Sequence, residues 1–490
     1  MKSSTVVWRL LVLGLSLAIC IPSPAQAPVS NLEFESSDAR LAQAFAWAKT
    51  RALAYAHGDS DPVGPWYEAA LPGRDAFCMR DVAHQTTGAA ALGLYAQNRN
   101  MLERFAAAVS PTRDWAGYWE IDQLGHPSAA DYANDNDFWY NLPANFDVLD
   151  SIVRMWRWTG DSSYLDDAAF QRFFRSTATD YVAAWELQPE LILKRPRLMN
   201  RRLPQGKFVE ARGIPSYSEG EKDFNVGTDL LAAEYRGFES LRFLATRSDE
   251  TESAQSYADT ATKLMWIVEH KAWSVKDRHF MGFFSQDGST DGSGDTMVLY
   301  FGATKDPSHI RAALSYIESE PYLKSIGIEE ESYLAQIFYR YGEKSAAYER
   351  ILDLTRPDKE RRDYPEVSFS VIGAMVTGMM GVEVDDGGAE GPLVHSISRL
   401  LKESDSATLR GLRVQDKLVD LEHDGSRKSV LTNRSKETIR WQAAFPGRVK
   451  ILTVNGKKVC ATISADVLQS PVSWIVTDVP AGAAVSVARP

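Results

Sequence analysis

The chain has 490 residues and a formal net charge of -11, with 44% hydrophobic residues, and of its three cysteines only Cys78 and Cys460 lie beyond the N-terminal segment. An acidic chain without a basic stripe is a poor partner for nucleic acid, and two cysteines so far apart exclude a disulfide framework and a CxxC metal site. A chain of this length can bury a large apolar core, so we expect packing to hold the fold together.

The N-terminal segment 1–27 has the features of a secretory signal peptide. It begins with Lys2 and Arg9, continues through the apolar run 10–21 and ends in the sequence AQA. The run is too short to span a bilayer comfortably, and no later stretch approaches eighteen uncharged apolar residues. We therefore expect a periplasmic or secreted protein with no membrane contact after signal removal, and a mature charge of -13 once Lys2 and Arg9 are lost.

Helical periodicity dominates residues 28–385. The predicted helices are 39–56, 79–97, 99–109, 141–159, 164–187, 226–246, 251–272, 293–302, 307–318, 330–341, 345–354 and 368–381. Helices with a polar face, such as ESAQSYADTATKLMWIVEHKAW, alternate with small, apolar ones such as EVSFSVIGAMVTGMMGVEV. Alternating outer and inner helices predict a mainly α fold, an (α/α)6 toroid of six helical hairpins. An open α-solenoid is the alternative, but solenoid units share one length, and these connections do not.

The period of the hydrophobic pattern changes to two in residues 393–490. Segments such as TIRWQAAF and PVSWIVTDV alternate apolar and polar residues, and Asn455-Gly456 is a strong type I′ hairpin signal. We expect a small C-terminal all-β sandwich domain. Because it has no carboxylate-rich loop, it is predicted to be a packing module.

The long connections fall mainly before the even-numbered, inner helices. In chain order they are GPWYEAALPGRDAFCMRD, YWEIDQLGHPSAADYANDND, GIPSYSEGEKDFN, SQDGSTDGSGD, GIEEES and RRDYPEVSF. The inner helices of a toroid of antiparallel hairpins all point the same way, so these six loops should converge on one end of the barrel. One carboxylate before a helix is usually a cap, but six such loops together favour a functional cleft.

Carboxylates beside aromatic rings are typical of a sugar-processing site. Aromatic rings stack on the C–H face of a pyranose, carboxylates accept its hydroxyl hydrogen bonds, and two further carboxyl groups perform the hydrolysis. The candidate stacking residues are Trp66, Tyr67, Trp115, Tyr118, Trp119, Trp139 and Tyr140. Each one taken alone is more often a core residue.

The chain resembles the six-hairpin, or (α/α)6-barrel, glycosidase superfamily over about residues 35–385. The segments that carry the resemblance are LPGRDAFCMRD, NDNDFWYNLP, SEGEKDFNVGTD and YPEVSF. Several inverting members place the general acid before the sixth helix and the general base before the twelfth. The resemblance therefore implies Glu219 or Glu221 as the acid and Glu366 as the base. Pro365 stiffens the backbone before Glu366, and the apolar residues after it favour partial desolvation.

Other members of this superfamily use aspartates before the second and fourth helices. Here these are Asp81 together with Asp135 or Asp137. The whole sequence looks most like the branch that includes bacterial exo-β-glucuronidases, which makes a uronic acid the first specific substrate hypothesis. An arginine left without a carboxylate partner would bind the uronate carboxylate bidentately. The loop arginines are Arg74, Arg80, Arg212, Arg361 and Arg362.

Taken together, the expected partner is a carbohydrate, an oligosaccharide or a glycoside. The candidate catalytic residues are Glu219, Glu221, Glu366, Asp137 and Asp135. The candidate substrate-binding residues are Arg74, Asp75, Arg80, Asp81, Trp66, Tyr67, Trp119, Trp139, Tyr140, Tyr217 and Tyr364. No cofactor fingerprint is present, and the segment DGSTDGSGD matches no EF-hand spacing, so neither a cofactor nor a metal is expected.

Three alternatives stay open at this level. A polysaccharide lyase of the same toroid would need a tyrosine or histidine base, for which Tyr217, His84 or His126 could serve. An unsaturated glucuronyl hydrolase would use acidic residues, and a non-catalytic carbohydrate-binding protein would keep the fold alone. The excess of acids over histidines favours hydrolysis.

Overall fold

The computed structural model describes residues 30–195, 206–220 and 224–490. The predicted signal peptide, residues 1–27, and the candidate acid Glu221 lie outside these residues.

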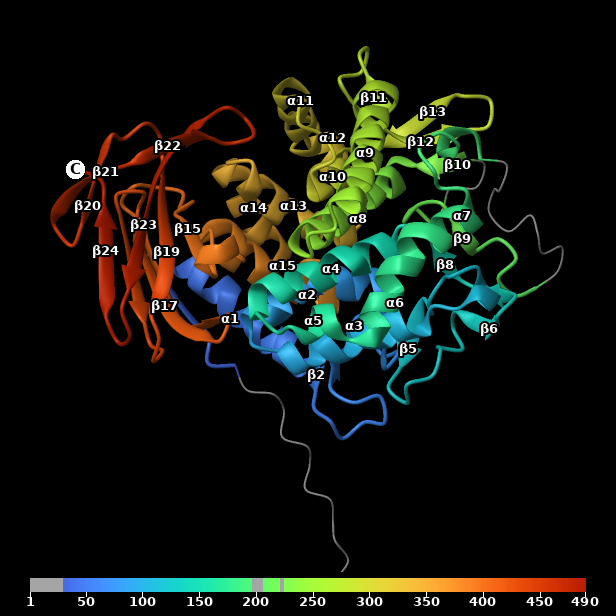
Figure 1. Ribbon diagram of the computed structural model, residues 1–490, viewed down its shortest axis with the longest axis horizontal. Helices are drawn as coiled ribbons and strands as arrows, with labels where there is room; N and C mark the ends of the chain where they lie inside the picture. Colours follow the sequence, from blue (N-terminus) through green and yellow to red (C-terminus); the bar gives the residue numbers. More distant parts are fainter. Residues whose placement is uncertain (1–29, 196–205, 221–223) are drawn as a thin grey trace, which may run out of the picture.

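Within the described residues, twelve helical segments alternate between an outer and an inner position (Figure 1). The inner helices are α2 (Met79–Ala91), α4 (Ala144–Thr159), α8 (Thr228–Arg247), α10 (Asp295–Phe301), α13 (Ile328–Arg340) and α15 (Pro365–Gly373), the last continued by the π-helix η5 (Ala374–Met379). The outer helices are α1 (Ala39–Ala54), α3 (Tyr95–Ala108), α6 (Ala168–Ser176) with η2 (Thr177–Tyr181) and α7 (Val182–Trp185), α9 (Thr251–Ile267) with η4 (Val268–Ala272), α11 (Pro307–Ile317) and α14 (Lys344–Leu354).

The inner helices close into a ring. Each contacts the next in chain order, and α15 returns to α2. This closure confirms the (α/α)6 toroid and rules out the open solenoid, in which the last hairpin would not meet the first. The ring is the core of the barrel, because nearly every residue of α4 and α15 is buried.

Small residues set the closest approach between inner helices. A Cβ atom added to Gly88 in α2 would lie 2.0 Å from the carbonyl oxygen of Phe369 in α15, and one added to Gly378 would lie 2.7 Å from the ring of Tyr339. These glycines look like helix breakers in the sequence. In the structure they allow the backbone of one inner helix to contact the backbone or an aromatic ring of the next.

The C-terminal region is a two-sheet β-sandwich, at the left of Figure 1. One sheet has the order β1 (Glu33–Ser36), β16 (Ser406–Val414), β17 (Lys417–Asp424), β18 (Lys428–Asn433), β24 (Ala484–Ala488), β20 (Ile451–Val454) and β21 (Lys457–Cys460). The other has the order β14 (Glu383–Asp385), β15 (Leu393–Ile397), β19 (Ile439–Pro446), β23 (Pro471–Val479) and β22 (Thr462–Ala465). Both Asn455 and Gly456 have positive φ between β20 and β21, as a type I′ turn requires.

Two strands of the sandwich come from sequence assigned to the barrel. The N-terminal β1 pairs with β16, and β14 precedes the predicted boundary at residue 393. The sandwich also bonds to the barrel directly, since Gln415 donates its backbone N–H to the carbonyl of Trp158 at 2.6 Å and Tyr95 donates its hydroxyl to the carbonyl of Arg413 at 2.6 Å. The β-region is therefore fastened to the helices by backbone contacts.

Short paired strands extend the end of the ring at which the inner helices begin. They are β4 (Ala76–Cys78) with β5 (Glu120–Asp122), β6 (Tyr132–Asn134) with β7 (Asp137–Phe138), β8 (Tyr140–Asn141) with β9 (Arg212–Ile214), and β10 (Phe224–Gly227), β12 (His279–Ser285) and β13 (Thr290–Ser293) together. Among the residues described, none of the helices combines the length and apolar character that a membrane span requires.

Substitution of Gly88 by alanine tests the helix contact. The new methyl group would force α2 and α15 apart, and we expect the free energy of unfolding to fall by about 1 to 3 kcal/mol. Chemical denaturation measures the loss. A Cβ on Gly58 meets no atom within 4 Å, so Gly58→Ala is the matched control. Equal stability of the two variants would contradict the close packing of α2 and α15.

Candidate active site

Every inner helix carries a carboxylate in its first turn. These residues are Asp81 in α2, Asp147 in α4, Asp229 in α8, Asp295 in α10, Glu329, Glu330 and Glu331 in α13, and Glu366 in α15. The partial positive charge of a helix N-terminus favours a carboxylate there. One end of the barrel therefore collects acids from six separate helices.

A cavity of about 360 Å³ opens at this end. Its wall is formed by 216–219, by Gly282, Phe283, Ser293 and Gly294 of the hairpin before α10, by 327–330 and Tyr333 of α13, and by Arg80, Asp229, Met297 and Arg361. Five of the six predicted loops thus meet at one cavity. The exception is the loop before α4, which supplies none of the lining residues in the part of the chain that the structure describes.

Glu219 faces this cavity from the loop after β9. Its side chain is exposed at the cavity mouth, yet the surrounding protein partly desolvates the carboxyl group and raises its pKa, and the negative charge of Glu329 acts in the same direction. Arg80 and a hydrogen bond from Asn141 oppose the shift without cancelling it. Glu219 therefore holds its proton to a higher pH than an ordinary glutamate, which is what a general acid needs.

Glu329 is a second carboxylate on the cavity wall, and it is ion-paired. The guanidinium of Arg80 lies 2.7 Å from its Oε2 atom and also lies 3.1 Å from Asp81. Tyr364 is hydrogen-bonded to the same glutamate. The cavity wall thus contains Glu329, which faces a fixed positive charge, and three carboxyl groups whose pKa is raised, Glu219, Asp229 and Glu330.

Asp229 holds the segment that carries Glu219. Its Oδ2 atom accepts the backbone N–H of Tyr217 at 2.5 Å and the hydroxyl of Ser216 at 2.8 Å. Burial raises the pKa of Asp229 to about 6, although these hydrogen bonds lower it. Because Glu219 follows two residues after Tyr217, these contacts of Asp229 fix the position of the backbone that leads to Glu219.

A buried ion-pair network lies beneath the cavity floor. His84 Nε2 lies 2.5 Å from Asp147 Oδ2, and His84 Nδ1 lies 3.6 Å from Glu366 Oε1. Tyr217 donates its hydroxyl to Asp147 at 2.9 Å, and Tyr333 donates its hydroxyl to Glu366. Burial alone would lower the pKa of His84, but the two carboxylates raise it to about 9. An imidazolium therefore joins the inner helices α2, α4 and α15.

The predicted base Glu366 belongs to this network and does not line the cavity. It is 1% exposed, and the ring of Tyr333, which does line the cavity, is bonded to it. A substrate in the cavity would meet Tyr333 before Glu366. Glu366 thus positions Tyr333 in this structure, and Glu219 is the member of the predicted pair that reaches the cavity.

The two predicted aspartates in the loop before α4, Asp135 and Asp137, stabilise that loop. Asp135 is ion-paired with Arg113 at 2.6 Å and accepts the hydroxyl of Tyr132 at 2.6 Å. Asp137 accepts the backbone N–H groups of residues 207 and 208, each at 2.8 Å. Neither residue is part of the cavity wall, so the structure gives both a structural role.

Most of the predicted stacking residues belong to the core. Trp66, Tyr67 and Tyr140 are fully buried, and Trp119 is nearly so. Trp115, Tyr118 and Trp139 are half-buried and pack against core residues. The aromatic side chains that do face the cavity are Tyr217, as predicted, together with Phe283 and Tyr333. The expectation that Trp139 or Tyr140 lines the pocket is not met in this structure, because both rings are used in packing.

Four of the five loop arginines already pair with carboxylates. Arg74 bonds Glu120 and Asp131, Arg80 bonds Asp81 and Glu329, Arg212 bonds Asp114, and Arg362 lies 3.9 Å from Asp363. Asp75 is exposed beside Arg74 in a left-handed conformation. Arg361 differs: it is exposed on the cavity rim, it contacts Tyr364, and no carboxylate pairs with it among the described residues.

Several residues of the wall were not predicted from the sequence, namely Asp229, Phe283, Glu329, Glu330 and Tyr333. The loop GIEEES is correctly predicted to border the pocket, but sequence alone does not tell which of three consecutive glutamates turns toward the cavity. Glu331 turns away from it and pairs with Arg350 and Lys359 on the outer side.

No metal site is evident in the described part of the chain, where no group of three or more His, Cys, Asp or Glu side chains could hold an ion. The segment DGSTDGSGD contributes strand β13, and in the turn before it Asp287 accepts hydrogen bonds from Ser289.

Comparisons with known proteins give matches in structure alone. No family model matches the chain, and a search of curated proteins finds no match. An α-L-rhamnosidase from Dictyoglumus thermophilum superposes with a TM-score of 0.57 at 13% identity, over 94% of this chain and 51% of its own. A putative kojibiose phosphorylase from the human microbiome gives 0.55 at 10% identity, over 92% and 60%. A GH78 rhamnosidase of Bacillus sp. GL1 gives 0.54 at 12% identity, over 83% and 40%.

The chain spans about 40 to 60% of the length of these proteins. At such low identity the likeness shows the fold, an (α/α)6 toroid with a β domain.

Substitution of His84 by glutamine tests the network below the cavity. Removing one partner of a buried ion pair should lower the free energy of unfolding by about 3 to 5 kcal/mol. The pKa of His84 is raised from 6.5 to about 9 in the folded protein. Its contribution is therefore complete below pH 6.5 and is lost as the pH rises through about 9.

Denaturation of both proteins over this pH range gives the difference directly. His270→Gln, on the surface of an outer segment, is the control, and it should give a small difference. If the His84→Gln difference did not change with pH, the imidazolium assignment would be wrong.

Proposed function

We propose that this chain is a glycoside hydrolase whose catalytic cavity lies at the end of the barrel where the inner helices begin. Glu219 protonates the leaving oxygen, and Glu329 is the ionised carboxylate that activates water or attacks the anomeric carbon. The observation that carries the proposal is the pairing of these two groups in one cavity: a carboxyl group with a raised pKa and a carboxylate held by Arg80.

The remaining wall suits a sugar. Phe283, Tyr217 and Tyr333 offer aromatic surface for the C–H face of a pyranose, and Glu330, Ser218 and Ser293 offer hydrogen-bonding groups for its hydroxyls. A volume of about 360 Å³ matches a small-ligand site. The structural relatives are consistent with this proposal, since the superposed proteins are named as rhamnosidases and a kojibiose phosphorylase.

We further propose that the substrate carries a uronic acid. Arg361 supports this choice, because it is the loop arginine that reaches the cavity rim without a carboxylate partner in the described residues. A guanidinium binds a carboxylate with two parallel hydrogen bonds.

The three bases considered for the lyase alternative are poorly suited to that role. Its candidates Tyr217 and His84 are both committed to Asp147. Burial raises the pKa of Tyr217 well above the ordinary value, and His84 has a pKa of about 9, so both groups are protonated at neutral pH. The third candidate, His126, is not among the residues of the cavity wall. These observations favour hydrolysis.

Glu219→Gln and Glu329→Gln test the catalytic pair. We expect each variant to lose about 10²- to 10⁴-fold in kcat on a glycoside with a poor leaving group. A nitrophenolate leaving group needs little protonation, so Glu219→Gln should recover much of its activity on an aryl glycoside and Glu329→Gln should not. Steady-state kinetics on both substrates give the comparison.

Glu252→Gln, exposed on an outer helix, is the matched control. If Glu219→Gln or Glu329→Gln kept full activity on the glycoside with the poor leaving group, the substituted residue would have no catalytic role. Sugar binding without turnover by the wild type would instead support a non-catalytic binding protein.

Arg361→Gln tests the uronate proposal. Loss of one charge-assisted bidentate contact should raise KM for a uronide about 10- to 100-fold and leave KM for the neutral sugar of the same configuration unchanged. The ratio of the two values is the measurement. Equal effects on both substrates would contradict carboxylate recognition by Arg361.

A further inference from the structure

A second cavity, of about 410 Å³, lies at the opposite end of the barrel. It is bordered by the later turns of α4, by the C-terminal ends of α10 and α13, by η5 and by the segment 382–384 that leads into the sandwich. It shares no lining residue with the candidate active site. Its position between the barrel and the sandwich makes it a separate site, and ligand binding there would not depend on the proposed hydrolase activity.

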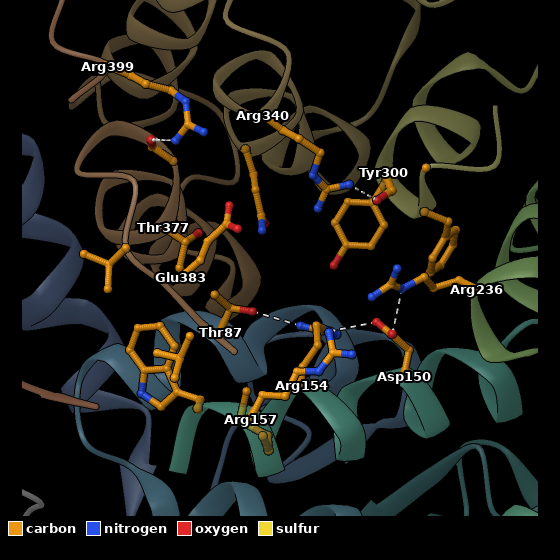
Figure 2. Close-up of a pocket in the computed structure, with 18 residues that line it drawn as sticks. Thr87, Asp150, Arg154, Arg157, Arg236, Tyr300, Arg340, Thr377, Glu383 and Arg399 are labelled. Carbon is orange, nitrogen blue, oxygen red and sulfur yellow. Dashed lines mark hydrogen bonds and ion pairs between the residues drawn. The ribbon is translucent and has the colours of Figure 1, made fainter. Parts of the chain in front are cut away.

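Positive charge dominates this cavity. Its lining contains five arginines, Arg154, Arg157, Arg236, Arg340 and Arg399, and two carboxylates, Asp150 and Glu383. Figure 2 shows the arginine side chains around one space, and they come from α4, α8, α13 and the segment after β15. An excess of three positive charges in one cavity is unexpected in a chain whose formal net charge is -11.

Part of this charge has a structural purpose. Arg154 and Arg236 each bond Asp150 at 2.8 Å. Arg340 donates to the carbonyl oxygens of Leu299 and Tyr300 at the end of α10, and Arg399 donates to that of Gly378 at 2.8 Å. The C-terminal ends of helices carry partial negative charge, which arginines there offset. These contacts explain why four of the arginines are present.

Arg157 is not explained in this way. Its guanidinium lies 4.0 Å from the centre of the Phe243 ring, and within the described residues no carboxylate, hydroxyl or carbonyl group bonds to its side chain. Burial and the nearby charge of Arg236 lower the pKa of Arg157, while Asp150, Asp385 and Asp386 oppose the shift without cancelling it. Burial and Arg340 lower the pKa of Arg399, while Glu383 opposes the shift. The neighbouring carboxylates therefore do not fully compensate these two positive charges.

Hydroxyl groups complete the lining. Thr87 and Thr377 face the cavity from two inner helices. Figure 2 shows the Tyr300 hydroxyl directed into the space that the arginines surround. The site thus offers guanidinium N–H donors and hydroxyl groups from several directions. A tetrahedral dianion, with oxygens on all sides, can use such an arrangement better than a planar carboxylate.

We propose that this cavity binds a compact tetrahedral oxyanion of the phosphate class, either inorganic phosphate or a small phosphate monoester. Bound there, a dianion would neutralise most of the excess charge and would join α4, α8 and α13 to the start of the sandwich. Binding would therefore stabilise the contact between barrel and sandwich.

Titration calorimetry with inorganic phosphate, at constant ionic strength set by chloride, tests the proposal. We expect saturable binding and a rise in the melting temperature of the wild type. Arg157→Glu should weaken binding at least about tenfold, since a charge-assisted contact is replaced by repulsion. Among the described residues no polar group is bonded to the Arg157 side chain, so its replacement leaves no buried group unpaired. Arg157→Gln should weaken binding less, and it tests the site if the reversed charge of Arg157→Glu impairs folding. Arg175→Gln, exposed on outer helix α6, should bind phosphate like the wild type.

Two further ligands identify the anion. Tighter binding of glucose 1-phosphate than of phosphate would assign the site to a phosphate monoester, and equal or weaker binding would assign it to inorganic phosphate. Citrate binding as tightly as phosphate would overturn the tetrahedral assignment. Absence of phosphate binding, or binding unchanged in both Arg157 variants, would overturn the proposal.

Discussion

The buried imidazolium of His84, held between Asp147 and Glu366, is the constraint on which the barrel mouth depends. A charge buried among apolar helices is tolerated only where opposite charges meet it with good geometry. The three inner helices that carry His84, Asp147 and Glu366 must therefore keep their relative positions. The same two carboxylates bind the hydroxyls of Tyr217 and Tyr333, whose rings form the cavity floor. Core stability and the shape of the candidate active site are consequently set by one network.

Helix polarity divides the chemistry of the barrel between its two ends. Six helix N-termini meet at one end, and each carries a carboxylate. Helix C-terminal ends meet at the other, and the cavity there is lined by five arginines. Each charge complements the local dipole. At both ends, however, the charges exceed what capping requires: Glu219 lies outside any helix, and Arg157 caps no carbonyl group in the described part of the chain. The two candidate sites are built on these surplus groups.

The sequence predicts the architecture well. Polar-faced helices alternate with small apolar ones, and the unequal connections between them favour a closed toroid over an open solenoid. The sequence also predicts that the acidic loops converge. It does not separate pocket aromatics from core aromatics: Trp66 and Tyr67 lie in a loop with the right composition but are fully buried. Nor does it show that Tyr333 lies between Glu366 and the cavity, since that depends on contact between α13 and α15, 33 residues apart in the chain. Side-chain direction within a loop depends on tertiary contacts that composition does not record.

The central claim is that the acidic mouth of the barrel cleaves a glycosidic bond. Release of nitrophenolate from a panel of nitrophenyl glycosides and uronides tests this claim most directly. We expect turnover of at least one substrate, and the proposed role of Arg361 predicts that a uronide is preferred over its neutral parent sugar. Folded, monodisperse protein that released nitrophenolate from no member of the panel, from acidic to alkaline pH, would contradict the claim.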